Sequence, residues 1–142
     1  MQKLNQSYIK SVVKKALEED LRPKGDITTS LINSKNKMIK AKIIAKQDGI
    51  IAGLDFCKTA FKSVGKETIF SKKVSDGKKI KKNKLIAEIT AKAKTILTAE
   101  RTALNFLNHA SGIATTTNKF VKKVGKKTKI CCTRKTTPNL RL

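Results

Sequence analysis

The arginines are the residues of this chain whose type and sequence context most clearly indicate a binding function. Of its 33 cationic residues only four are arginines, at Arg22, Arg101, Arg134 and Arg141. Arginine carries a planar fork of donors that binds a carboxylate or a phosphate through two parallel hydrogen bonds, which lysine cannot do. Because lysine supplies plain positive charge nearly everywhere else, we predict that Arg101 and Arg134 bind an anion.

Arg101 lies in a stretch whose composition differs from that of the rest of the chain. Residues 95–118 carry only two charges, Glu100 and Arg101, although 30% of the chain is charged. We therefore expect this stretch to be buried or to lie at an interface. Gly112 weakens a helix interior by roughly 1 kcal/mol, so it indicates a kink, a close approach or a domain boundary. Apolar residues spaced by three and four predict one helix face, made of Ile96, Ala99, Ala103, Phe106, Ala110 and Ile113.

The second pair of cations follows a short apolar run. Residues 129–133 predict a buried strand that ends at Arg134 and Lys135. Functional side chains of α/β proteins gather at the carboxyl ends of strands, which favours a binding role for both cations. The adjacent cysteines, Cys131 and Cys132, are assigned to the strand, because neighbouring cysteines rarely form a disulfide.

The segments before residue 95 predict a mixed α and β domain that would position these groups. Apolar residues alternate with lysines at 39–46, which is typical of a half-buried strand. The expected elements are a helix capped by Ser7, a strand at 39–45, a return strand after Asp48-Gly49, a helix at 54–64 closed by Gly65, and strands at 68–74 and 85–90.

A net charge of +23 at pH 7 raises nucleic acid as a possible partner. The lysines, however, are spread along the chain among many Ile and Asn residues, which is typical of A/T-rich coding. Aromatic residues that could stack on bases are also scarce, because Tyr8 is the single tyrosine and there is no Trp. We therefore expect no specific nucleic-acid partner, although loose, salt-sensitive binding to polyanions is expected in any case.

No run of apolar residues reaches the roughly 18 that a membrane span needs. The segment from Met1 to Gln6 also lacks the apolar core of a signal peptide. We expect a cytoplasmic protein without a membrane partner. With a single histidine, His109, and an odd count of three cysteines, a zinc site is not expected. His109 lies in the apolar helical stretch and is expected to be packed there.

Five segments, in this order along the chain, resemble the quinolinate phosphoribosyltransferase family, also called nicotinate-nucleotide pyrophosphorylase (carboxylating). Each segment alone is a weak signal, and the five together are specific. The resemblance implies conversion of quinolinate and phosphoribosyl pyrophosphate to nicotinate mononucleotide, pyrophosphate and CO2, in de novo NAD synthesis. The segments are Glu19–Thr29, Gln47–Gly53, Glu100–Leu107, Ser111–Thr115 and Thr133–Pro138.

The resemblance also implies an architecture. An α+β sandwich is expected over residues 1–109, followed over residues 110–142 by the start of an α/β barrel that is truncated after its first strand. The family works as a homodimer or larger assembly, with each active site between one subunit's barrel and the neighbour's sandwich. Because the later residues of the family's site are missing, this chain is expected to be an incomplete fragment that is inactive alone.

The family pattern gives roles to four residues. Arg101 is implied to reach across the subunit interface to the carboxylates of quinolinate, and Thr133, Arg134 and Lys135 are implied to contact quinolinate at the mouth of the barrel. No catalytic residue is assigned, because a positive pocket suffices without a covalent nucleophile. Magnesium is expected to accompany phosphoribosyl pyrophosphate, with its ligands beyond this chain. Asn139 departs from the family pattern, in which a glycine is usual.

Three alternatives are open at this point. A molybdenum-transport-associated homologue would share the fold but act on another substrate, although the Thr133–Thr136 motif together with Arg101 favours quinolinate. A basic nucleic-acid-binding module would explain the charge. The hairpin at 75–89 is similar to that of biotinyl or lipoyl carrier domains, but it lacks their modifiable lysine motif.

The role of Arg101 also has an alternative. Arg101 could simply pair with Glu100.

Overall fold

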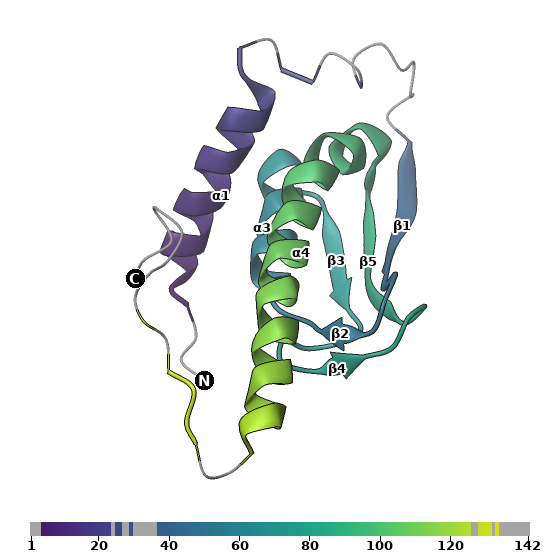
Figure 1. Ribbon diagram of the computed structural model, residues 1–142. Helices are drawn as coiled ribbons and strands as arrows, with labels where there is room; N and C mark the ends of the chain where they lie inside the picture. Colours follow the sequence, from purple (N-terminus) through teal and green to yellow (C-terminus); the bar gives the residue numbers. More distant parts are fainter. Residues whose placement is uncertain are drawn as a thin grey trace.

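Helices cover one side of a small antiparallel sheet, as Figure 1 shows. The computed structural model describes residues 4–23, 25–26, 29, 37–125, 128–131 and 133. This arrangement confirms the predicted mixture of α and β structure. The elements are α1 (Gln6–Leu21), β1 (Met38–Ile44), β2 (Gly49–Ile50), α3 (Leu54–Val64), β3 (Ile69–Lys72), β4 (Lys79–Ile80), β5 (Leu85–Lys92) and α4 (Ala93–Val124).

The main sheet has the strand order β1-β5-β3, and all its pairs are antiparallel. Side chains of a strand alternate between the two faces, so β5 buries Ala87, Ile89 and Ala91 toward the helices. Glu88 points to the other face, where it forms an ion pair of 2.7 Å with Lys73. The β5 strand is therefore the centre of this sheet, because among the described strands it alone has a neighbour on both edges.

The return strand predicted after Asp48-Gly49 forms, but it does not pair as expected. β2 pairs with β4 in a separate two-stranded sheet, and β1 pairs with β5 in the register Ala41↔Ile89. The predicted hairpin of adjacent strands is therefore wrong. The physical reason is burial. Pairing with β5 places the half-buried residues of β1 beside the buried residues of β5, on one face that packs against the core, and the two residues of β2 could not extend that face.

The first helix begins two residues earlier than predicted. Its cap is Asn5, whose side chain accepts a hydrogen bond of 2.9 Å from the backbone N–H of Ser7. Ser7 therefore lies inside the helix and donates to the capping group. The residues at intervals of four, Ile9, Val13 and Leu17, are all buried and hold α1 against α3 and α4.

The last helix, α4, runs unbroken from Ala93 to Val124. Gly112 is therefore not a helix boundary, and a Cβ placed there would meet nothing within 4 Å, so it is not a close approach either. The expected burial holds for the first half of the helix, where Ala99 and Ala103 are fully buried. The second half is not buried within this chain, since Ile113 is 56% exposed, because the sheet and α3 extend along only part of this long helix. The alternative that this half lies at an interface stays a prediction.

The strand predicted at 129–133 is not formed in the residues that the structure describes. Residues 128–131 and Thr133 are exposed and belong to neither a helix nor a strand, and Cys132 lies outside the described residues. A strand needs hydrogen-bonded neighbours, and no described strand lies beside this segment. The apolar pattern alone was therefore not enough to form one.

Candidate functional site

The predicted anion-binding residue Arg101 meets the end of α1. One of its terminal nitrogens, Nη1, lies 3.0 Å from Oδ1 of Asp20. The Arg101 side chain is 75% exposed, whereas that of Asp20 is only 22% exposed. The alternative that Arg101 pairs with Glu100 is therefore wrong. The guanidinium donates through Nη1 to this carboxylate, and most of the Arg101 side chain stays exposed.

A second carboxylate, Asp26, ties the segment after α1 to the start of α4. It accepts hydrogen bonds from the backbone N–H of Thr29 at 2.9 Å, from the Thr29 hydroxyl, and from the Thr98 hydroxyl at 2.7 Å. These hydrogen bonds, the Thr29 side chain first, lower the pKa of Asp26, and the positive charge of Arg101 lowers it further. Asp26 is therefore ionised at neutral pH, beside Arg101.

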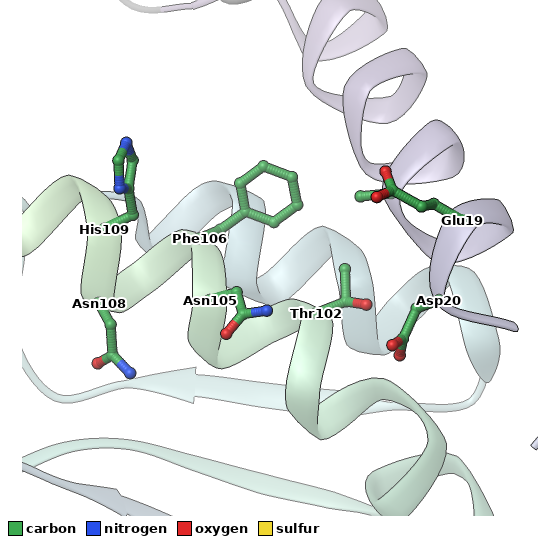
Figure 2. Close-up of a pocket in the computed structure, with 8 residues that line it drawn as sticks. Glu19, Asp20, Thr102, Asn105, Phe106, Asn108 and His109 are labelled. Carbon is green, nitrogen blue, oxygen red and sulfur yellow. The ribbon is translucent and has the colours of Figure 1, made fainter. Parts of the chain in front are cut away.

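A groove lies between the end of α1 and α4, beside the Asp20–Arg101 pair (Figure 2). It has a volume of about 880 Å³, within the usual range of small-molecule sites. Phe106 forms a fixed wall, because its ring stacks on that of Phe56 with the centroids 5.1 Å apart. The lining residues are Ala16, Glu19, Asp20, Thr102, Asn105, Phe106, Asn108 and His109.

The single histidine is placed differently from the prediction. His109 is exposed at this groove rather than packed in the core. The reason is its position on α4, where it follows the buried Leu107 by two residues and so points away from the core. His109 adds a hydrogen-bonding group to the groove, next to the amides of Asn105 and Asn108.

The charge around Arg101 limits what it can bind alone. Asp20 and Asp26 both carry negative charge beside it, and Glu19 stands on the opposite wall of the groove. Two carboxylates, those of Asp20 and Asp26, therefore lie close to the Arg101 guanidinium. Like charges repel, so a dianion would bind here only if further cations came from elsewhere.

The other predicted site residues are described only in part. Thr133 is exposed, and Arg134 and Lys135 lie outside the described residues, so their approach to Arg101 stays a prediction. Reasoning from the sequence missed Asp20 and Asp26 as neighbours of Arg101. A usable signal existed, since both belong to one of the five segments that resemble the family.

Two more of those segments pack against each other and fix the position of α4. The backbone N–H groups of Ile50 and Ala52 donate to the hydroxyls of Thr115, at 2.9 Å, and Ser111, at 3.0 Å. Gly53 adopts a φ of 95°, and a Cβ there would lie 3.1 Å from the Cβ of Ala110. The glycine and the hydroxyls are thus needed for the close contact between this segment and α4.

The sequence of this chain matches the models of two protein-family domains. The model of the quinolinate phosphoribosyl transferase N-terminal domain matches residues 26–111, and that of the C-terminal domain matches residues 113–142. The chain belongs to the quinolinate phosphoribosyltransferase family. Asp26, Arg101 and Ser111 lie within the N-terminal match, whereas Thr115 lies within the C-terminal match, so the α4 helix spans parts of both.

Individual members of the family are similar to this chain in sequence and in structure. A probable nicotinate-nucleotide pyrophosphorylase (carboxylating) of Methanocaldococcus jannaschii is 44% identical, over 94% of this chain and 46% of that protein. The corresponding protein of Bacillus subtilis is 36% identical, over 98% of this chain and 48% of that protein. The crystal structure of NadC from Streptococcus pyogenes superposes with a TM-score of 0.92 at 36% identity, and covers 99% of this chain and 50% of that one.

The chain spans about half the length of the curated relatives it matches. Within the described residues, no helix combines the length and apolarity that crossing a membrane requires. Cytoplasmic location and the absence of a nucleic-acid partner stay predictions from composition.

Proposed function

We propose that the whole protein containing this chain is a phosphoribosyltransferase of de novo NAD synthesis. It converts quinolinate and phosphoribosyl pyrophosphate to nicotinate mononucleotide, pyrophosphate and CO2. The observation that carries this proposal is Arg101, which is anchored at one nitrogen by Asp20 but keeps 75% of its side chain exposed. A relative from Nicotiana glauca, 37% identical, is named a quinolinate phosphoribosyltransferase (decarboxylating), which supports the choice of substrate.

The active site is completed by a second subunit. Arg101 stands among acidic neighbours, so the two carboxylates of quinolinate need additional cations. Arg134 and Lys135, supplied by the barrel of the partner subunit in a homodimer or larger assembly, would provide them. In this arrangement residues 1–109 form the sandwich domain and residues 110–142 begin the barrel. The α4 helix, which crosses this boundary without a break, would link the two domains rigidly.

The proposed chemistry needs binding and electrostatics rather than a nucleophile. Arg101 and Arg134 would bind the quinolinate carboxylates with forked hydrogen bonds, and Thr133 and Lys135 would fix the ring. Fixing the ring holds its nitrogen near the anomeric carbon of the ribose donor. Loss of CO2 leaves negative charge beside that nitrogen, and a positive pocket that excludes water stabilises it.

Magnesium would enter with phosphoribosyl pyrophosphate, but the described residues do not fit a site for it. They contain no group of three acidic, histidine or cysteine side chains that could hold a metal ion. Asp20 is engaged by Arg101, and Asp26 by Thr29 and Thr98. We assign the magnesium ligands to the half of the relatives that this chain does not span.

The proposal is tested by turnover. The whole protein that contains this chain, or a chimera of residues 1–142 with the second half of the Methanocaldococcus jannaschii relative, is assayed with quinolinate and phosphoribosyl pyrophosphate for release of pyrophosphate and CO2. We expect turnover from both, and none from residues 1–142 alone. Steady turnover by residues 1–142 would contradict the fragment proposal. A folded whole protein without activity on quinolinate would contradict the function.

A further inference from the structure

The pairing of Asp20 with Arg101 is asymmetric. The carboxylate is the fixed member, because Asp20 is largely covered and lies on α1, which is anchored to the core three residues earlier by Leu17. The guanidinium is the free member, since its side chain is 75% exposed. The contact therefore fixes the position of the arginine more than that of the aspartate.

Two other ion pairs, those of Asp55 and Asp48, differ in this respect, whereas the Glu88 carboxylate, paired with Lys73, is also only 22% exposed. The Asp55 carboxylate, which pairs with Lys72 at 2.6 Å, is 47% exposed, and the Asp48 carboxylate, which pairs with Lys81 at 2.7 Å, is 51% exposed. Exposed pairs of this kind contribute little to the stability of a fold. Among the ion pairs of the described residues, two have a carboxylate that is less than a third exposed. The cation is a lysine in one of them, Lys73–Glu88, and an arginine in the other, Arg101–Asp20.

The position of Asp20 is secured from a second side. Asp26, six residues further on, accepts a hydrogen bond of 2.7 Å from Thr98, which precedes Arg101 by three residues on α4. The chain that follows α1 is thus attached to the same helix that carries Arg101. This attachment adds a second contact between the two segments that carry Asp20 and Arg101.

We infer that Asp20 is a positioning residue for quinolinate binding. By binding Nη1 of Arg101, it holds the guanidinium with its remaining donors directed to the substrate carboxylate. The inference rests on the proposed function. A long, unrestrained arginine would lose its conformational freedom when substrate binds, and that loss weakens binding. Asp20 removes this freedom before the substrate arrives.

The test is Asp20→Asn in the whole protein, with separate KM values for both substrates. The amide cannot hold the guanidinium by charge, so we expect KM for quinolinate to rise by about three- to tenfold, which corresponds to ordering one long side chain. We expect kcat and KM for phosphoribosyl pyrophosphate to stay within about twofold, because Asp20 does not contact the reacting atoms in this scheme. Asp20→Glu should restore most of the affinity.

Asp55→Asn is the matched control, because it removes a carboxylate from an ion pair whose two members do not line the groove. It should leave both KM values unchanged, and the thermal midpoints of the two variants should be alike. An unchanged or lowered KM for quinolinate in Asp20→Asn would overturn the inference, and a lowered value would mean that Asp20 competes with the substrate. A loss of kcat alone would also overturn it. If the unmodified protein has no activity on quinolinate, the proposed function itself fails, which is a distinct result.

Discussion

Ser111 and Ala52 are joined by two hydrogen bonds. The Ser111 hydroxyl accepts from the N–H of Ala52 at 3.0 Å and donates to the carbonyl oxygen of the same residue at 3.1 Å. One turn further along α4, Thr115 accepts from the N–H of Ile50 at 2.9 Å. The helix therefore satisfies backbone groups next to β2 that would otherwise need another strand.

Removing the Ser111 hydroxyl should destabilise the fold. In Ser111→Ala the N–H and carbonyl groups of Ala52 both lose their partner in a partly buried place, so we expect a loss of about 1–2 kcal/mol in the free energy of unfolding. Urea titration followed by circular dichroism measures this loss. Thr117→Ala, at an exposed position of the same helix, is the control and should change little. Equal stabilities of the two variants would contradict this role of Ser111.

Two glycines should respond in opposite directions to alanine. A Cβ at Gly65 would lie 2.6 Å from Cγ2 of Thr95, so Gly65→Ala should cost about 1–3 kcal/mol through overpacking. A Cβ at Gly112 would meet nothing within 4 Å inside α4, so Gly112→Ala should stabilise by about 0.5–1 kcal/mol. Thermal unfolding of both variants checks this pair. A Gly112→Ala protein that is less stable would show that the glycine is needed for something else.

The buried thiol of Cys57 should be inert. Burial raises the pKa of Cys57 to about 12, so almost none of it is thiolate at neutral pH. Iodoacetamide followed by peptide mapping should label the exposed Cys131 in the native protein and Cys57 only after unfolding. Because the unfolded thiol loses its proton near pH 9 and the folded one near pH 12, this group should also lower stability as pH rises above 9. Rapid native labelling of Cys57 would contradict its placement.

Acid should remove a contribution of Asp26 to stability. Hydrogen bonds from Thr29 lower the pKa of Asp26 below the ordinary 3.8, so its folded form binds a proton less readily than its unfolded form. The stabilisation is present above about pH 4 and is lost as pH falls through the lowered value. Unfolding midpoints measured from pH 6 to pH 3 should therefore fall less steeply in Asp26→Asn than in the unmodified protein. Parallel curves would contradict this prediction.

Arg101 and Arg134 should be the arginines on which activity depends most. In the whole protein, Arg101→Ala and Arg134→Ala should each lower kcat/KM for quinolinate about 10- to 100-fold, because each removes charge-assisted hydrogen bonds. Arg101→Lys should recover only part, since lysine lacks the fork. Arg22→Ala is the control, because Arg22 is exposed and pairs only loosely with Glu18, at 3.5 Å. Normal kinetics in both alanine variants would refute the site.

Local patterns predicted local structure well. The spacing of apolar residues predicted α1, α3 and the part of α4 from Ile96 to Ile113, because a helix face is set by residues three and four apart. The scarcity of arginine pointed to Arg101, and the five segments together pointed to the family. Each of these conclusions depends on the order of residues along the chain and not on their tertiary contacts.

Pairings between distant segments had to come from the tertiary structure. β1 pairs with β5 rather than with the nearby β2, because the burial gained by the whole sheet outweighs the favourable turn at Asp48-Gly49. The same holds for Asp20, which lies 81 positions from Arg101 and meets it only because α1 packs beside α4. The sequence by itself determined which residue types could bind a dianion. Only the folded chain decided which carboxylate holds the arginine in place, since that choice depends on how the helices pack.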